Sequence, residues 1–331
     1  MRPAHLVPLL CLVACAPAPP RASIAGGHVI AQSAFRSPLL VLEAGTGKVL
    51  ATLPADGYAD APPTAKGLFF VHGDGGLVAR SAATGAARWR VFSKASYYTS
   101  PVATDSAVFV FDPKPDAHVW RGYATESGAK VFDVPCDDYA PLAAGGGLLF
   151  TIEDGALVAR NLEDGKTKYR VVKDVEAPIV AAEERFFARV DDGLGVFRSE
   201  NGRLERTLDV GTDALATVGG VAPGLAATTD VVIAAGDGGV RALDASTGKR
   251  RWEITLEDAE SLALAGEVLV VGAGETVVGL DPASGKKRWS TPVEPSVDGV
   301  SAGGGLVAAR AGSHVVVLEA ATGKRRFAQE L

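Results

Sequence analysis

Short apolar runs recur along the chain with the same polar punctuation between them. In each unit, a segment of small residues is followed by an apolar run such as Val231–Ala235 and by a Gly/Asp turn such as Gly236–Gly239. A third run ends in a Thr-Gly or related turn, and a fourth carries an aromatic residue four positions after the turn glycine. Apolar runs bounded by such turns predict β-strands joined as hairpins. We therefore expect four strands, A to D, in each unit.

The turn glycines show how often the unit recurs. They are 37 to 46 residues apart, a period typical of four-stranded propeller blades. The fourth residue after the glycine is Ala51 in the first unit, Arg206 in the fifth and aromatic in the other six. We expect these aromatic side chains to wedge between neighbouring blades. The glycines are Gly47, Gly85, Gly128, Gly165, Gly202, Gly248, Gly285 and Gly323, and the wedge residues are Trp89, Phe132, Tyr169, Trp252, Trp289 and Phe327.

Repetition of this kind predicts the architecture. A four-stranded sheet buries both faces only between two neighbours, so a series of such sheets is stable as a closed ring. The expected fold is all-β, an eight-bladed β-propeller of four-stranded antiparallel blades that forms a single domain over residues 22–331. The first and last units both contain four strands, so we expect blade 1 to pack against blade 8 without a swapped strand. Closure by a swapped strand is the alternative.

The N-terminus has the pattern of an export signal. Arg2 precedes an apolar stretch, Leu6–Val13, that is too short to span a bilayer. Leu12–Cys15 resembles the bacterial lipobox, which implies a lipoprotein signal peptide at residues 1–14, lipidation of Cys15 and a tether at residues 15–21. Residue 16 is alanine, not the aspartate of inner-membrane retention, so we expect an outer-membrane anchor facing the periplasm. An ordinary cleaved signal with an incidental Cys15 is the alternative.

Composition narrows the classes of function. Apolar residues make up 47% of the 331 residues, enough for a large core. A net charge of −6 argues against nucleic-acid binding, which requires a broad basic surface. Three cysteines cannot form a disulfide framework, so the fold must depend on its core.

Residues suited to catalysis or metal binding are few. His28, His72, His118 and His314 match no zinc signature, although His28 and His314 would approach each other if blades 1 and 8 touch. Cys136 has no neighbouring cysteine, and we expect it to be buried and to have no chemical role. Small apolar residues in the A strands supply few groups for acid–base chemistry. We therefore expect no catalytic, cofactor-binding or metal-binding residues.

Two surface features suggest contacts with other molecules. The triplets 249–251, 286–288 and 324–326 are basic and fall on consecutive D strands. They fit protection of exposed strand edges, and contact with anionic headgroups or an acidic partner is the alternative. Two longer connections, 112–117 and 211–221, emerge on the same rim of the ring, where insertions often mark a binding face. The candidate rim residues are Asp112, Lys114, Asp116 and Asp213.

The repeat itself resembles a known family. Ala242–Trp252 is similar to the repeat of pyrroloquinoline-quinone-type propellers, Ala-x-Asp-x-x-Thr-Gly-Lys-x-x-Trp. The quinone-dependent dehydrogenases of that superfamily are longer and hold the quinone against a vicinal cysteine disulfide with calcium. This chain has no adjacent cysteines. A quinone-dependent enzyme is thus the less favoured reading.

The lipobox, the short tether and eight such repeats together resemble the BamB family of outer-membrane assembly lipoproteins. That resemblance implies a non-catalytic scaffold without a cofactor, a monomer within a larger complex. Its partners would be the periplasmic domains of BamA or unfolded outer-membrane proteins. A general extracytoplasmic interaction or sensor lipoprotein is the alternative within the binding class.

Overall fold

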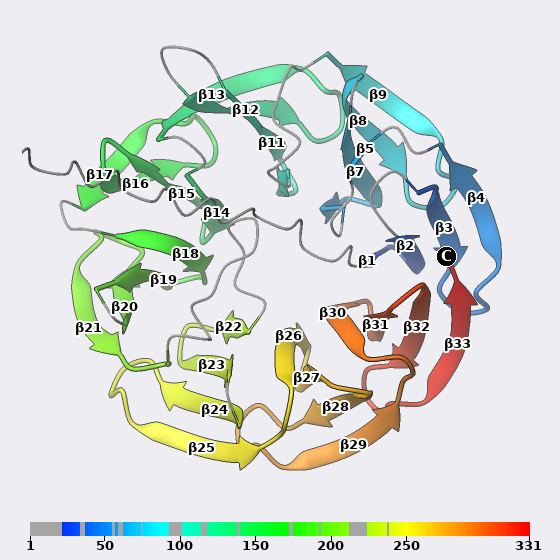
Figure 1. Ribbon diagram of the computed structural model, residues 1–331. Helices are drawn as coiled ribbons and strands as arrows, with labels where there is room; N and C mark the ends of the chain where they lie inside the picture. Colours follow the sequence, from blue (N-terminus) through cyan, green and yellow to red (C-terminus); the bar gives the residue numbers. More distant parts are fainter. Residues whose placement is uncertain are drawn as a thin grey trace, which may run out of the picture.

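The strands form a ring of sheets. The structure, a computed structural model, describes residues 22–33, 37–54, 57–58, 62–73, 75–92, 101–113, 118–137, 140–171, 175–191, 193–211, 224–236 and 238–331. Over these ranges, eight antiparallel sheets stand radially around a central axis, with the first strand of each sheet innermost (Figure 1). The same ranges contain no helix with the length and apolarity to cross a bilayer. The expected eight-bladed, all-β propeller is confirmed.

Blades 1 to 4 take up the first half of the chain. Their strands are, in blade 1, β1 Ser23–Ala25, β2 His28–Gln32, β3 Leu39–Glu43 and β4 Val49–Leu53; in blade 2, β5 Gly57–Tyr58, β6 Thr64–Ala65, β7 Leu68–Gly73, β8 Gly76–Ser81 and β9 Ala87–Val91; in blade 3, β10 Val102–Ala103, β11 Ala107–Asp112, β12 His118–Ala124 and β13 Lys130–Cys136; in blade 4, β14 Leu142–Gly145, β15 Leu148–Glu153, β16 Ala156–Asn161 and β17 Thr167–Val171. In blade 2, both β5 and β6 pair with β7, so the inner position is shared by two short strands.

Blades 5 to 8 complete the ring. Their strands are, in blade 5, β18 Glu176–Ala181, β19 Arg185–Val190, β20 Gly193–Arg198 and β21 Leu204–Leu208; in blade 6, β22 Leu225–Ala227, β23 Val231–Gly236, β24 Gly239–Asp244 and β25 Arg250–Thr255; in blade 7, β26 Ala259–Ala265, β27 Val268–Ala273, β28 Thr276–Leu280 and β29 Lys287–Pro292; in blade 8, β30 Val297–Gly303, β31 Leu306–Ala311, β32 His314–Glu319 and β33 Arg325–Glu330.

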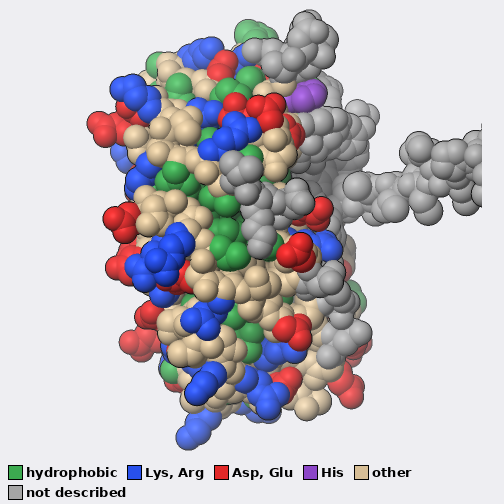
Figure 2. Space-filling model, turned by 90° about the vertical axis from the view of Figure 1, so that its left-hand side faces the viewer, with side chains coloured by type: hydrophobic (Ala, Val, Ile, Leu, Met, Phe, Trp, Pro, Cys, Tyr) green, Lys and Arg blue, Asp and Glu red, His purple; other side chains and the backbone are tan. Residues whose placement is uncertain are grey.

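Each blade has two ends that lie on opposite faces of the ring. The A–B hairpins and the C–D turns, which contain the repeated glycines, form one face, here called the turn face. The B–C hairpins and the D–A connections form the other, here called the connection face. β1 starts on the connection face, so the chain enters the ring there at Ser23. The outer wall over blades 4 and 5 carries basic and acidic side chains side by side (Figure 2).

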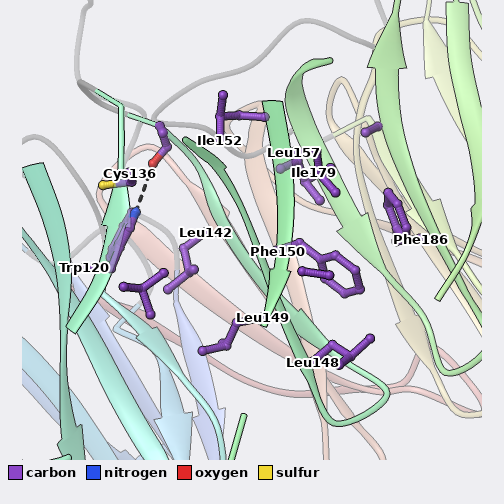
Figure 3. Close-up of a cluster of buried hydrophobic side chains, with 14 of the residues drawn as sticks. Trp120, Cys136, Leu142, Leu148, Leu149, Phe150, Ile152, Leu157, Ile179 and Phe186 are labelled. Carbon is purple, nitrogen blue, oxygen red and sulfur yellow. Dashed lines mark hydrogen bonds between the residues drawn. The ribbon is translucent and has the colours of Figure 1, made fainter. Parts of the chain in front are cut away.

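Burial follows from the position of each strand in its blade. All residues of β11 and of β27 are buried, because sheets on both sides cover the second strand. The outer strands β9 and β17 keep only alternate residues partly covered. The core therefore lies between blades. Figure 3 shows the cluster that joins blades 3 to 5, where the rings of Phe150 and Phe186 have centroids 4.6 Å apart.

Closure of the ring uses side-chain contacts and no exchanged strand. Blade 1 consists of β1 to β4 and blade 8 of β30 to β33, which confirms the expected closure. Across the junction, the Ser301 hydroxyl donates to the Ala22 carbonyl. Arg310, 1% exposed, donates to the Ser33 carbonyl at 3.1 Å. Arg310 also donates to the carbonyls of Gly312 and His314 within its own blade, so its buried charge is hydrogen-bonded on several sides.

Candidate functional site

The fourth residue after each turn glycine packs on the turn glycine of the next blade. A Cβ added to six of these glycines would lie less than 3.0 Å from an aromatic ring atom of the preceding blade, so only glycine leaves room for the ring. The wedge residues thus lie between blades at six of the eight junctions. The pairs are Trp89 with Gly128, Phe132 with Gly165, Tyr169 with Gly202, Trp252 with Gly285, Trp289 with Gly323 and Phe327 with Gly47.

Polar groups of the wedge residues bond to one equivalent position in the next blade. Three indole Nε1 groups and the Tyr169 hydroxyl each donate to the carbonyl three residues before the turn glycine. Burial raises the pKa of the Tyr169 hydroxyl and so favours the protonated form that donates this bond. Each wedge of this kind therefore combines apolar burial with a directional bond. The carbonyl acceptors belong to Thr125, Ser199, Pro282 and Ala320, at 2.9 to 3.0 Å.

The two non-aromatic residues occupy the same place. Ala51 lies against the position of a Gly85 Cβ, at 2.8 Å, with Leu53 beside it. Arg206 lies 3.7 Å from the corresponding position at Gly248. The junctions that follow blades 1 and 5 therefore keep the geometry of the repeat with different chemistry.

The third residue of each basic triplet is an arginine that is bound to an acid of its own blade. The acid lies four residues before the turn glycine and the arginine three residues after it. The side chains of Arg288 and Ser284 bond to Asp281 and lower the pKa of its carboxyl to about 2. These arginines thus form ion pairs within their own sheets while remaining partly exposed. The pairs are Arg251–Asp244 at 2.7 Å, Arg288–Asp281 at 2.6 Å and Arg326–Glu319 at 2.9 Å.

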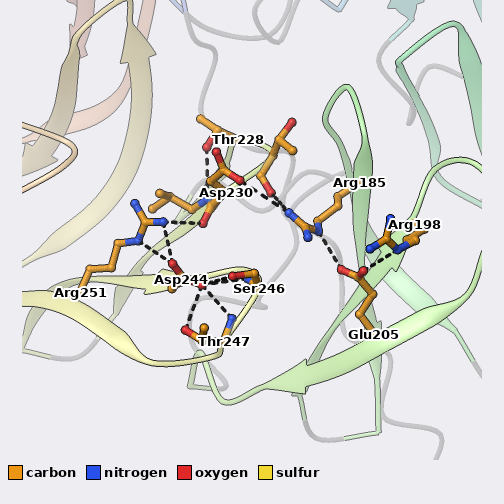
Figure 4. Close-up of polar contacts among 11 residues, drawn as sticks. Arg185, Arg198, Glu205, Thr228, Asp230, Asp244, Ser246, Thr247 and Arg251 are labelled. Atoms are coloured by element: carbon orange, nitrogen blue, oxygen red, sulfur yellow. Dashed lines mark hydrogen bonds and ion pairs between the residues drawn. The ribbon is translucent and has the colours of Figure 1, made fainter.

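Blade 5 carries the same pair with its charges exchanged. Arg198 lies four residues before the turn glycine and bonds to Glu205 at 2.7 Å, and Arg185 bonds to the other carboxylate oxygen of Glu205 at 2.8 Å. Arg185 also donates to the Thr229 carbonyl in blade 6 at 2.7 Å (Figure 4). These contacts join blades 5 and 6 on the turn face, where Arg206 replaces an aromatic wedge.

Only one of the four candidate rim residues lies among the described residues. Asp112 ends β11 and is 6% exposed, and its carboxylate is paired with Arg121 at 2.7 Å. Its side chain is therefore directed into the sheet, where Arg121 compensates its charge. Lys114, Asp116 and Asp213 fall outside the described residues, as does the predicted lipidation residue Cys15.

The histidines and the cysteine are spread over the ring. His28 begins β2 on the turn face, whereas His314 begins β32 on the connection face, so the expected approach of these two residues is wrong. Cys136 is buried at the end of β13, and no disulfide involves it among the described residues. No group of three or more His, Cys, Asp or Glu suited to a metal ion is found in the described part of the chain.

Sequence reasoning missed a group of exposed apolar side chains on the outer wall. Val49 and Leu50 on β4, Phe92 just after β9 and Val131 on β13 are the large exposed hydrophobic residues in the described ranges. Leu50 and Val131 both lie three residues after a turn glycine, where blades 6 to 8 have a paired arginine. Comparison of that one repeat position across the eight units would have found them.

The fold and the blade junctions define an eight-bladed propeller of the pyrroloquinoline-quinone repeat class. The family model described as outer membrane protein assembly factor BamB matches residues 36–135, 104–263 and 260–331. The chain belongs to this family. No curated protein sequence is significantly similar to the chain.

Solved structures share the fold at low sequence identity. BamB from Moraxella catarrhalis is 17% identical with a TM-score of 0.64, over 89% of this chain and 94% of that one. The quinohemoprotein alcohol dehydrogenase of Comamonas testosteroni is 14% identical with a TM-score of 0.59, over 93% and 74%. The dihydro-heme d1 dehydrogenase NirN is 11% identical with a TM-score of 0.69, over 96% and 76%. The ring architecture is therefore common to an outer membrane protein assembly factor and to dehydrogenases.

Proposed function

We propose that this protein is a non-catalytic, lipid-anchored periplasmic scaffold that takes part in the assembly of outer-membrane β-barrel proteins. The observation that carries the proposal is the match of the BamB family model to almost all of the chain from residue 36 onward. The proposed partners are BamA-like periplasmic domains or unfolded outer-membrane proteins. The proposed mode of action is binding without a cofactor.

The place where the chain enters the ring supports a particular orientation of the ring relative to the membrane. The chain enters the ring on the connection face at Ser23, and the proposed tether comprises residues 15–21. Seven residues span at most about 25 Å when fully extended. A lipid on Cys15 would therefore hold the connection face close to the membrane surface, where periplasmic domains of a membrane-embedded machine are within reach.

A crosslinked pull-down from the native envelope tests the proposal. The full-length protein is compared with Cys15→Ala, and with a variant whose 113–117 hairpin is shortened while Asp112 and His118 are kept. Retaining Asp112 matters because its ion pair with Arg121 belongs to the sheet. We expect recovery of BamA with the full-length protein and a clear reduction with the shortened hairpin.

Two other results would change the assignment. A different envelope protein recovered consistently without BamA would refute the assembly role and favour a general interaction or sensor lipoprotein. If no protein is recovered and pyrroloquinoline quinone with calcium raises the melting temperature, the non-catalytic reading is wrong. The location of the Cys15→Ala variant in soluble or membrane fractions tests the anchor separately.

A further inference from the structure

Over the described ranges, the outermost strand of every blade has one edge without a neighbouring strand. Such an edge can pair with a strand of another chain, and charged side chains are a common protection against this. Seven of the eight outer strands carry at least one charged residue within their described bounds. They are β9, β13, β17, β21, β25, β29 and β33, with charges that include Arg88, Lys130, Lys168, Glu205, Arg250, Lys287 and Arg325.

Strand β4 is the exception among these eight described strands. Its sequence is Val-Leu-Ala-Thr-Leu, and the nearest charge is Lys48, just before the strand. Val49 is 41% exposed and Leu50 36% exposed. Leu50 occupies the position at which blades 6 to 8 have an arginine paired with an acid. The equivalent acid here is Glu43, which accepts a hydrogen bond from the Thr46 hydroxyl instead.

The backbone of β4 sets the shape of what can bind there. β4 is the terminal strand of its sheet and pairs with β3 on one edge only. The register shifts between Val41 and Leu42, so regular pairing covers Ala51–Leu53. The free edge therefore fits a short extended segment that adds as a further strand, with backbone bonds supplying the affinity. A binding edge of this length predicts weak, reversible binding.

The side chains of β4 set the chemistry of the occupant. Ala51 and Leu53 face the turn of blade 2, whereas Val49, Leu50 and Thr52 are exposed. A charged residue in the added strand would find no counter-charge on β4, and apolar or Thr side chains would cover Val49 and Leu50. By contrast, the outer wall over blades 4 and 5 carries both basic and acidic side chains (Figure 2).

We propose that β4 is a docking edge for an extended, uncharged apolar–threonine segment of an unfolded β-rich polypeptide, which adds to blade 1 as an outer strand. This inference rests on the proposed function, because unfolded outer-membrane β-barrel proteins supply such segments. It places binding of the unfolded polypeptide on the outer wall of the ring. The proposed anchor and the 113–117 hairpin belong to the connection face instead.

Leu50→Arg provides the test, because it gives blade 1 the arginine that blades 6 to 8 already carry, opposite Glu43. Val131→Arg is the matched control, since Val131 has the same repeat position and is 43% exposed on a strand that already contains Lys130 and Asp133. The probe is a fluorescein-labelled peptide of alternating valine and threonine with Gly-Ser ends. Its binding to the purified full-length protein in detergent is followed by fluorescence anisotropy. A second peptide with proline at alternate positions lacks the required N–H donors.

We expect Leu50→Arg to weaken binding of the Val/Thr peptide at least about tenfold, which corresponds to one or two lost contacts of about 1 kcal/mol each. Val131→Arg should bind like the original protein, and the proline peptide should not bind. Equal affinity of Leu50→Arg and the original protein, or equal binding of the two peptides, would overturn the inference. A dimer in sedimentation that Leu50→Arg abolishes would make the occupant a second copy of this chain and would also overturn it.

The outcome is separable from that of the proposed function. Peptide binding that depends on Leu50, in a protein that recovers no BamA, would support the docking edge and refute the assembly role. Recovery of BamA by a protein whose peptide binding is unaffected by Leu50→Arg would support the assembly role and refute the docking edge. Melting temperatures of both arginine variants should equal that of the original protein, which excludes unfolding as the cause.

Discussion

The contact between Trp252 and Gly285 allows the strength of a blade junction to be measured. Trp252 is 8% exposed, its ring carbons lie 2.7 Å from the position of a Gly285 Cβ, and Nε1 donates to the Pro282 carbonyl at 2.9 Å. Trp252→Ala removes the ring and this donor. Burial loss of this kind costs about 3–5 kcal/mol and the unpaired carbonyl about 1 kcal/mol, so we expect about 4–6 kcal/mol in total.

Replacement of the glycine tests the same contact from the other blade. Gly285 has a φ of +70°, so Gly285→Ala combines a backbone cost with a collision between the new Cβ and the indole. Gly147→Ala is the matched control, because Gly147 has a φ of +74° and no atom within 4 Å of the added Cβ. We expect Gly285→Ala to lower the free energy of unfolding by about 2 kcal/mol more than Gly147→Ala does.

The assay is equilibrium unfolding in urea followed by circular dichroism, since fluorescence would change with the tryptophan itself. In the Trp252→Ala background, the excess cost of Gly285→Ala should disappear, because no ring remains to collide with. Equal costs for the two glycine variants, or a double variant with strictly additive costs, would refute the reasoning. An unchanged melting temperature of Trp252→Ala would refute the wedge role altogether.

Three further predictions concern other parts of the ring. Arg310→Met should lower the free energy of unfolding by about 3 kcal/mol, because it removes a buried side chain that donates to carbonyls of both end blades. A loss no larger than that of the exposed control Arg325→Met would contradict this. Burial lowers the pKa of His72 below 6.5, so its contribution to stability is present above pH 6.5 and is lost as the pH falls toward the folded pKa. His72→Gln should therefore reduce the loss of stability between about pH 7.5 and 5.5, and an undiminished loss in urea unfolding would contradict it. Asp281→Asn should destabilise the protein above pH 3.8. It should have no effect below about pH 2, where the original carboxyl is protonated in both the folded and the unfolded protein. An equal effect at both pH values would exclude the ion pair as its cause.

The repeat made the ring predictable from the sequence. Turn glycines such as Gly248 and Gly285, with aromatic residues at a fixed distance, define local hairpins, and local hairpins of equal length determine how sheets stack. The packing of blade 1 against blade 8, which closes the ring, was also predictable. The bond from Arg310 to the Ser33 carbonyl was not, because neither residue belongs to the repeated turn and wedge positions.

The candidate site was less predictable, because side-chain direction is not encoded by the repeat. Asp112 looks like a loop residue in the sequence, yet it is the last residue of a strand buried on both sides and pairs with Arg121. His28 and His314 lie in adjacent blades but on opposite faces of the ring, because each begins its strand and the two strands run in opposite directions. The exposure of Leu50 does not follow from the repeat, because the pattern defines the residue four positions after the turn glycine and leaves the third position open.

The wedge contacts relate the eight sheets to one another in the way that an interface relates the subunits of an oligomer. Every sheet carries both halves of the same contact, a side chain on its outer strand and a glycine in its turn, and each half meets its counterpart on a different sheet. Such a contact is the head-to-tail interface of a cyclic oligomer. In an open row of the same units, the first and the last unit would each keep one half of the contact unused. The eight sheets thus behave as covalently joined subunits, and Phe327 against Gly47 is the contact that an open row would lack.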